Sequence, residues 1–501
     1  MNSKKRNRFW QLHSLLGITL GLPLFVIFVA GTLAFFEPHA LNWLQPQFDR
    51  LSAEKKALNP AIDQLLQQHP ETDEISVVFA SEARPVTDIY LEANHEATHY
   101  WLDPVTHEAT RATEHEADIF HFFVDLHYFE FIPYGREATG VIAALFFTII
   151  LTGVVYQWRR MKQDAHPKNL SLQNKNRWKN IHRFTSLFTL PFQIVYSATG
   201  AALALGLLLA APAIYLYFDG KSEALNEALF PGQVITAAPV SETPQFPIDE
   251  AISVARSEWP AEVTPLLMQI HYHEKSEAAP ASNTIILHGK ENGTHFVGTH
   301  LLTLDGDLNV IHDQTPISHL GPMMIEGLVN LHFASFNNLV IKIIFILAGL
   351  IVSLSIAAGV FIFLQRRLQN VTQKTRSTKI LTILTHWCLG GLPLSIALSL
   401  HTAQFAPDFP LHVFSAVMAV TFITSIIVKK PLACYSLLSA AAFIALPITF
   451  AITHKQWPIQ FGSEHATMVT LFNLFFVLTA AGIYGLKVSL KTLGTAEESS
   501  A

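Results

Sequence analysis

The sequence has few cysteines and few charged residues, and each shortage excludes a class of protein. Its two cysteines, Cys388 and Cys434, both lie in apolar runs, and there is no CxxC or CxxCH. We therefore expect no zinc site, no covalently attached c-type haem and no disulfide framework. Charged residues make up 14% of the chain, half of it is apolar, and the mean hydropathy is +0.31. This composition is typical of a membrane protein.

Two further absences narrow the function. The net charge of −6 argues against nucleic acid as a partner. No GxGxxG follows a predicted strand, so NAD(P)H or a flavin would have to bind to a separate protein.

Apolar runs are what the sequence has in abundance, and about eight have the roughly 20-residue length that crosses a bilayer. They cover residues 13–36, 138–158, 184–211, 339–364, 380–401, 411–428, 432–453 and 466–486. The first run follows a basic start, as in a signal peptide, but it is longer and lacks a small-residue cleavage pattern. We predict a retained helix that spans a lipid membrane.

The basic residues predict the orientation of these helices. Residues 159–183 contain eight Lys or Arg and one acid, and residues 365–379 contain five and none. The positive-inside rule places these loops and both termini in the cytoplasm. The long segments 38–136 and 212–337 are then external, which in a bacterium means the inner membrane with two periplasmic loops.

Each external segment has the pattern of a small α+β module, a short amphipathic helix followed by three strands. The helices are predicted at 61–68 and 247–259, and the strands at 75–80, 87–93, 99–102, 263–271, 284–288 and 295–304. The predicted fold is an α-helical bundle of about eight transmembrane helices with two small periplasmic α+β modules. Its parts are helix 1 (1–37), the first module (38–136), helices 2 and 3 (137–211), the second module (212–337), helix 4 (338–365) and four C-terminal helices (380–487).

An internal repeat relates the two halves of residues 1–370. LHYFEF at 126–131 matches LHFASF at 331–336, and a glycine follows the histidine by 26 residues in one copy and 27 in the other, at Gly153 and Gly359. RFW with His13, Pro23 and a Gly-Thr pair is similarly repeated as RW with His182, Pro191 and a Thr-Gly pair. Each copy therefore carries two histidines at the ends of membrane helices.

Topology sorts these four histidines into two pairs. His13 and His182 are predicted at the cytoplasmic face, and His127 and His332 at the periplasmic face. Two imidazoles from different helices, without cysteine or carboxylate companions, suit the axial positions of a b-type haem in a helical bundle. A single one of them would be read as an interfacial histidine bonded to backbone, but four in a duplicated pattern favour two haems.

Arginines near these histidines are candidates for binding the haem propionates. Arg8, Arg136, Arg177 and Arg183 lie near enough in sequence to pair with haem propionates, although the positive-inside rule alone also accounts for arginines there. His121 competes with His127, but the two point about 240° apart on a helix. The second copy has no counterpart of His121, so we choose His127.

The C-terminal helices carry histidines outside the repeat. His386 and His401 are 15 residues apart, about 22 Å along one helix and roughly on one face. His412, His454 and His465 gather at the predicted periplasmic rim. All of them suit interfacial polar residues that cap helices. The functional alternatives to this interpretation are a third haem near His386 or His401, a quinone pocket or a docking surface for an electron donor.

Together, these motifs resemble the PepSY-associated transmembrane family. The resemblance covers roughly residues 1–370. Its histidine motifs are QLHSLLG around His13, the LHYF and LHFA histidines and the Arg-x4-His element of His182. Its other marks are the Thr-Gly pairs and the external segments that end in YWLDPVTHEAT and LLTLDGDLNV. It implies PepSY-like modules and two bis-histidine haems b, as in inner-membrane ferric-siderophore reductases of the family. Electrons would pass from a cytoplasmic or quinone donor to a periplasmic ferric siderophore or other ferric chelate. The chain departs from the pattern at Ala358-Gly359, which lacks the threonine, and in LHFASF, which lacks a glycine after the histidine.

Two other functions compete with this oxidoreductase. PepSY-like modules could sense or restrain periplasmic proteases, with the helices acting only as anchors. A metal or siderophore permease would need charged groups at mid-membrane or broken helices along a path. The apolar runs have no charged residues at their centres, so the permease ranks last.

Overall fold

The computed structural model of the chain divides into two compact units. One, here the membrane unit, comprises residues 1–44, 115–205 and 342–501, and the other, the sheet unit, comprises 45–114 and 206–341. The structure describes residues 3–46, 57–81, 86–93, 96–103, 106, 108–111, 118–161, 177–221, 224–225, 246–273, 282–291, 297–314, 320–336, 338–369, 375–428 and 431–498.

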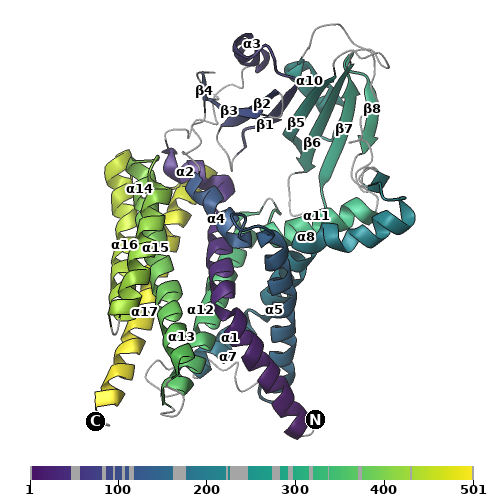
Figure 1. The fold of residues 1–501 in the computed structure, drawn as a ribbon. Helices are drawn as coiled ribbons and strands as arrows, with labels where there is room; N and C mark the ends of the chain where they lie inside the picture. The colour runs from purple at the N-terminus through teal and green to yellow at the C-terminus, as the bar shows by residue number, and fades with distance from the viewer. Residues whose placement is uncertain are drawn as a thin grey trace. The chain divides into compact units, whose positions relative to one another are not determined.

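The membrane unit is a bundle of helices (Figure 1). In the repeated part these are α1 (Ser3–Ala34), the 3-10 turn η1 (Glu37–His39), α2 (Ala40–Leu44), α4 (Asp118–Tyr128), α5 (Gly135–Gln157) with η3 (Trp158–Arg160), α7 (Arg177–Phe188), α8 (Leu190–Tyr217) as far as residue 205, and α12 (Leu339–Gln369) from residue 342. The C-terminal part has α13 (Arg376–His386), a π-helical turn η6 (Trp387–Gly391), α14 (Leu392–Phe405), α15 (Pro410–Ile427), α16 (Leu432–His454) and α17 (Glu464–Glu498).

These lengths confirm a multi-pass membrane protein. Among the described residues, seven helices are long and apolar enough to cross a bilayer, and α7 with α8 makes an eighth if the bent pair counts as one span. The C-terminal helices join the others through a buried aromatic cluster. Trp43 of α2 stacks on Phe472 of α17 at 5.8 Å, and its indole N–H donates to Asn473 Oδ1 at 3.3 Å.

The third span differs from the continuous helix predicted over 184–211. Helix begins at Arg177, and the chain bends by 70° between α7 and α8. A bend inside a membrane leaves backbone groups without partners, and side chains supply them here. The amide of Gln193 donates to the carbonyl of Ser186 at 2.9 Å and to Thr189 Oγ1 at 2.8 Å.

The sheet unit contains strands from both long segments, 38–136 and 212–337, in one antiparallel sheet (Figure 1). Its order is β4-β3-β2-β1-β5-β6-β7-β8. The elements are α3 (Asn59–Gln68), β1 (Glu74–Val78), β2 (Thr87–Ala93), β3 (Glu96–Leu102), β4 (Ala109–Arg111), α10 (Ile248–Glu258), β5 (Val263–His273), β6 (Ser282–Glu291), β7 (Thr299–Asp305), β8 (Val310–Gln314) and α11 (Leu320–Phe333). We predicted two modules, but pairing of β1 with β5 makes their strands one continuous sheet.

One face of the sheet packs on two helices that cap each other. Ile75 and Ile270, partners across the β1–β5 junction, belong to the core that includes residues of α3 and α10. The carboxylate of Asp249 accepts the backbone N–H groups of Leu58 and Asn59, while Asn59 Oδ1 accepts those of Ile248 and Asp249. This reciprocal exchange satisfies donors at both helix starts, which have no partner within their own helices.

The helix that precedes the apolar run, α4 in one copy and α11 in the other, ends in the same way in both copies. Phe129 follows α4 with φ 56° and Ala334 follows α11 with φ 51°. In each, a backbone N–H closes on the carbonyl five residues back, Glu130 to Asp125 and Ser335 to Asn330. This is the left-handed helix terminus that glycine favours, yet neither copy uses glycine.

Glycine at Ala334 should therefore stabilise the sheet unit. We expect Ala334→Gly to raise the melting temperature, because removal of the Cβ relieves about 1 kcal/mol of steric strain at a positive φ. Differential scanning calorimetry of the detergent-solubilised protein would measure it. A lower melting temperature than wild type would contradict the assigned backbone conformation.

Buried histidines make the stability of the sheet depend on pH. Burial lowers the pKa of His288 and His300 below the ordinary value of 6.5, although nearby acids offset part of the effect at His300. The unfolded chain then binds protons that the folded sheet does not, so stability is full above about pH 6.5 and falls as the pH drops. We expect a melting temperature that decreases from about pH 7.5 to pH 5, with a smaller decrease in His300→Met. His121→Gln, at an exposed position, is the control, and an unchanged pH profile in His300→Met would refute the account.

Candidate cofactor site

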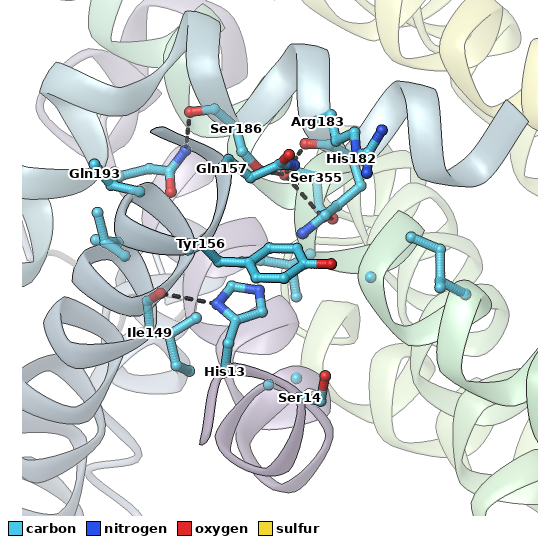
Figure 2. A pocket seen from close by; sticks show the side chains of 18 of the residues that line it. His13, Ser14, Ile149, Tyr156, Gln157, His182, Arg183, Ser186, Gln193 and Ser355 are labelled. Atoms are coloured by element: carbon cyan, nitrogen blue, oxygen red, sulfur yellow. Dashed lines mark hydrogen bonds between the residues drawn. The ribbon is translucent and has the colours of Figure 1, made fainter. Parts of the chain in front are cut away.

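His13 and His182 face each other in the membrane unit. His13 lies on α1 and His182 on α7, and their ring centres are 6.2 Å apart with the ring planes at 59°. Figure 2 shows the two side chains approaching the same space from different helices. The pairing predicted from the repeat is therefore present for these two residues.

Hydrogen bonds leave one nitrogen of each ring available to a ligand. His13 Nδ1 donates to the carbonyl of Ile149 at 2.9 Å, and His182 Nδ1 donates to the carbonyl of Ser355 at 2.8 Å (Figure 2). A nitrogen that meets a carbonyl must carry the ring proton, so Nε2 of each neutral imidazole has a free lone pair. Bonds of this kind orient metal-ligating histidines and fix their tautomer.

A glycine one turn further along the helix makes each of these bonds possible. A Cβ at Gly153 would lie 3.2 Å from His13 Nδ1, and one at Gly359 would lie 3.4 Å from His182 Nδ1. In both helices the glycine comes four residues after the accepting carbonyl. A side chain there would cover that carbonyl, because side chains of a helix point back toward its N-terminus. We call the carbonyl with its glycine a histidine seat.

His127 occupies a third seat of the same design. Its Nδ1 donates to the carbonyl of Ile27 at 2.8 Å, and a Cβ at Gly31 would lie 2.5 Å from that nitrogen. Gly31 follows His13 by 18 residues, which is five helical turns or about 27 Å. One face of α1 therefore presents an imidazole near one end and a seat for another imidazole near the other.

The departure at Ala358-Gly359 is compensated by a neighbouring residue. In the first copy, Thr152 Oγ1 donates to the carbonyl of Ile149, which also accepts His13. In the second copy, where alanine replaces this threonine, Ser355 provides the hydroxyl and bonds Ser186 Oγ at 2.6 Å. The seats of His13 and His182 thus each have a hydroxyl close to the accepting residue.

A cavity of about 280 Å³ opens between α1, α5, α7 and α12 around the two histidines. Gly17 lies on its α1 side, where an added Cβ would meet no atom within 4 Å. Apolar side chains such as Phe146 and Val352 form much of the wall. Basic groups, Lys179 and Arg183 among them, also line it.

The donor set and spacing fit a bis-histidine haem. Two metal–imidazole bonds of about 2 Å, with roughly 1 Å from each nitrogen to its ring centre, require ring centres about 6 Å apart. The 6.2 Å between His13 and His182 meets this requirement. Gly17 leaves open space on the α1 side, and the basic residues could neutralise propionates.

Of the four predicted arginines, only Arg183 lines the cavity. Arg8 and Arg136 are exposed, and Arg177 is buried over the ring of Trp178 at 5.7 Å. Lys179 and Arg366 also line the cavity, and the sequence pattern did not indicate either of them as a candidate. Arg366 belongs to the basic ending of an apolar run, whose repetition in both copies could have drawn attention to it.

The second predicted pair is divided between the units. His127 belongs to the membrane unit and His332, on α11, to the sheet unit. Their pairing thus remains a prediction from the repeat. His121 is exposed, with Nε2 3.8 Å from Asp125 Oδ1, whereas His127 occupies its seat.

Among the C-terminal histidines, His401 is engaged at both ring nitrogens. Nδ1 bonds Thr449 Oγ1 at 2.8 Å and Nε2 donates to the carbonyl of Ala442 at 2.9 Å. An imidazole held this way has no lone pair to offer, so His401 packs α14 on α16. His386 ends α13 at the start of the π-helical turn η6.

The seats predict a steric effect at Gly31. Gly31→Ala should lower the melting temperature of the membrane unit, since overpacking against the His127 ring costs about 1–3 kcal/mol. Gly482→Ala is the matched control, because a Cβ at Gly482 meets nothing within 4 Å. Thermal unfolding of both variants in detergent would compare them, and equal melting temperatures would show that His127 does not lie on Gly31.

Comparison with known proteins agrees with this architecture. Comparison with curated proteins finds no match. The family described as the PepSY-associated TM region matches residues 10–366, a stretch that contains all four repeated histidines and well over half of the chain. The chain belongs to the PepSY-associated transmembrane family.

Proposed function

We propose that this protein is a haem-b electron carrier of the bacterial inner membrane that reduces ferric chelates, such as ferric siderophores, on the periplasmic side. The observation that carries the proposal is the pair of imidazoles of His13 and His182, which face each other at 6.2 Å with their Nδ1 atoms bonded away. Bound b-type haem would supply one-electron redox chemistry at this point.

The residues around the His13 and His182 site have different roles in this proposal: to bind the haem iron, to position the rings, to exclude water and to compensate charge. His13 and His182 would hold the haem through their Nε2 atoms, and the seats at Gly153 and Gly359 fix the positions of the two rings. The apolar wall restricts access of water to the cofactor. Lys179, Arg183 and Arg366 offset the negative charge of propionates.

The repeat predicts a second haem near the opposite face, which His127 and His332 would hold. His127 already has its Nδ1 committed to a seat, as His13 and His182 do. In the orientation that the basic loops predict, His13 and His182 would hold one haem toward the cytoplasmic side and His127 and His332 would hold the other toward the periplasm. The two haems would supply one-electron transfer between a cytoplasmic or quinone donor and the chelate. One electron added to a ferric chelate gives the ferrous form, which binds hard oxygen ligands less tightly and releases the metal.

Haem content tests this proposal most directly. We expect a pyridine haemochrome assay on the purified protein to give about two haems b per chain, and about one in His13→Ala or His182→Ala, because one imidazole cannot hold a low-spin haem alone. His121→Ala should keep the wild-type content. A colourless protein would overturn the proposal and favour the sensor or protease-regulating alternative.

Electron delivery to the chelate needs its own measurement. Protein reduced with dithionite, freed of excess reductant and mixed with a ferric hydroxamate should be reoxidised, with ferrous iron trapped by a chelator in equal amount. The same mixing with the gallium complex of that hydroxamate is the control, since gallium(III) accepts no electron under these conditions. Haem-loaded protein that stays reduced with the ferric complex would exclude reductase activity.

A further inference from the structure

Helix α11 carries His332 in its last turn and is tied to the sheet on both sides of that residue. Glu326 comes six residues before the histidine and Ser335 three residues after it. Both make contacts within the sheet unit, to which His332 also belongs.

The first contact joins Glu326 to the start of β7. Its Oε1 accepts the backbone N–H of Gly298 at 3.0 Å, that of Thr299 at 3.1 Å and the hydroxyl of Thr299 at 2.8 Å. Three donors converge on one carboxylate oxygen, and hydrogen bonds to a charged acceptor are the stronger kind. Residues 298–299 are thereby fastened to the middle of α11.

The second contact joins Lys290 of β6 to the end of α11. Its Nζ donates to the carbonyl of Ser335, directly after the left-handed residue Ala334. Lys290 and Thr299 are ladder partners in the β6–β7 pairing. The ladder pair Lys290 and Thr299 therefore contacts the α11 segment at two residues, Glu326 and Ser335. These two residues are nine positions apart, and His332 lies between them.

In the described part of the first copy, the residues at the matching positions do not make these contacts. The position of Glu326 is taken by His121, which is exposed, and that of Ser335 by Glu130. His127 is held instead by its seat on α1, inside the membrane unit. The two repeated histidines thus belong to different bodies, one anchored to a membrane helix and the other to the sheet.

We propose that Lys290 and Glu326 are positioning residues that fix α11 on the sheet and thereby set the orientation of the His332 imidazole. The inference rests on the proposed function, in which His332 is an axial ligand of the second haem. The sheet would then influence the midpoint potential of that haem, because Lys290 and Thr299, which contact the α11 segment, belong to the sheet. The haem of His13 and His182 has both ligands in the membrane unit and is independent of these contacts.

The experiment compares Glu326→Gln, Glu326→Ala and Lys290→Met with wild type in the full-length protein. Glu262→Gln, at an exposed position of the same unit, is the matched control. Optical redox titration and low-temperature EPR of the ferric protein should show a changed midpoint potential and a changed low-spin signal for one haem only. The other haem serves as the internal reference, and Lys290→Arg should restore most of the wild-type signal.

Hydrogen exchange provides a readout that needs no haem. Mass spectrometry should detect amide exchange in residues 326–336 about tenfold faster in Glu326→Ala and Lys290→Met than in wild type, because each loses charge-assisted bonds that close the helix onto the sheet. Unchanged exchange, or two haems that keep their wild-type signals or shift together, would overturn the inference. Faster exchange in a protein that contains no haem would instead contradict the proposed function, but it would establish the contacts of Glu326 and Lys290 with the sheet and the α11 segment.

Discussion

A histidine N–H donated to a helix carbonyl beside a glycine is the interaction on which the site depends. It occurs at His13, His127 and His182, each time across two helices that are distant in the sequence. The same bond joins helices and orients a ring. An imidazole in an apolar bundle would otherwise bury a polar N–H without a partner, which is costly. The glycine permits the close approach of the ring to the carbonyl.

The duplication explains why two such arrangements meet in one bundle. α1 with α5, and α7 with α12, are equivalent pairs in which the first helix gives a histidine and the second a seat. The copies are not identical in backbone. α1 runs through Pro23 without a break, whereas the equivalent segment bends by 70° after α7. Both still bring an imidazole to the same cavity, which indicates that the position of the ring has been kept while the path of the helix has changed.

In the sheet unit, the two halves depend on each other for strand pairing and helix capping. Its two halves share a sheet through β1 and β5, and helices α3 and α10 exchange caps through Asn59 and Asp249. Neither half completes its helix starts alone. This mutual dependence makes the two segments one compact unit, and that unit includes α11 with His332.

The linear pattern was enough to predict most of the apolar spans, the strand at 87–93, the repeat and the approach of His13 to His182. Helix length, strand alternation and repeated spacing are properties of the chain itself. The pattern did not predict the sheet that joins both long segments, since pairing between β1 and β5 links residues almost two hundred positions apart. Nor did it predict the seats, the bend at Thr189 or the full basic lining of the cavity. These depend on which carbonyl, glycine or cation a neighbouring helix brings within reach, and only the packing of the helices in three dimensions decides that.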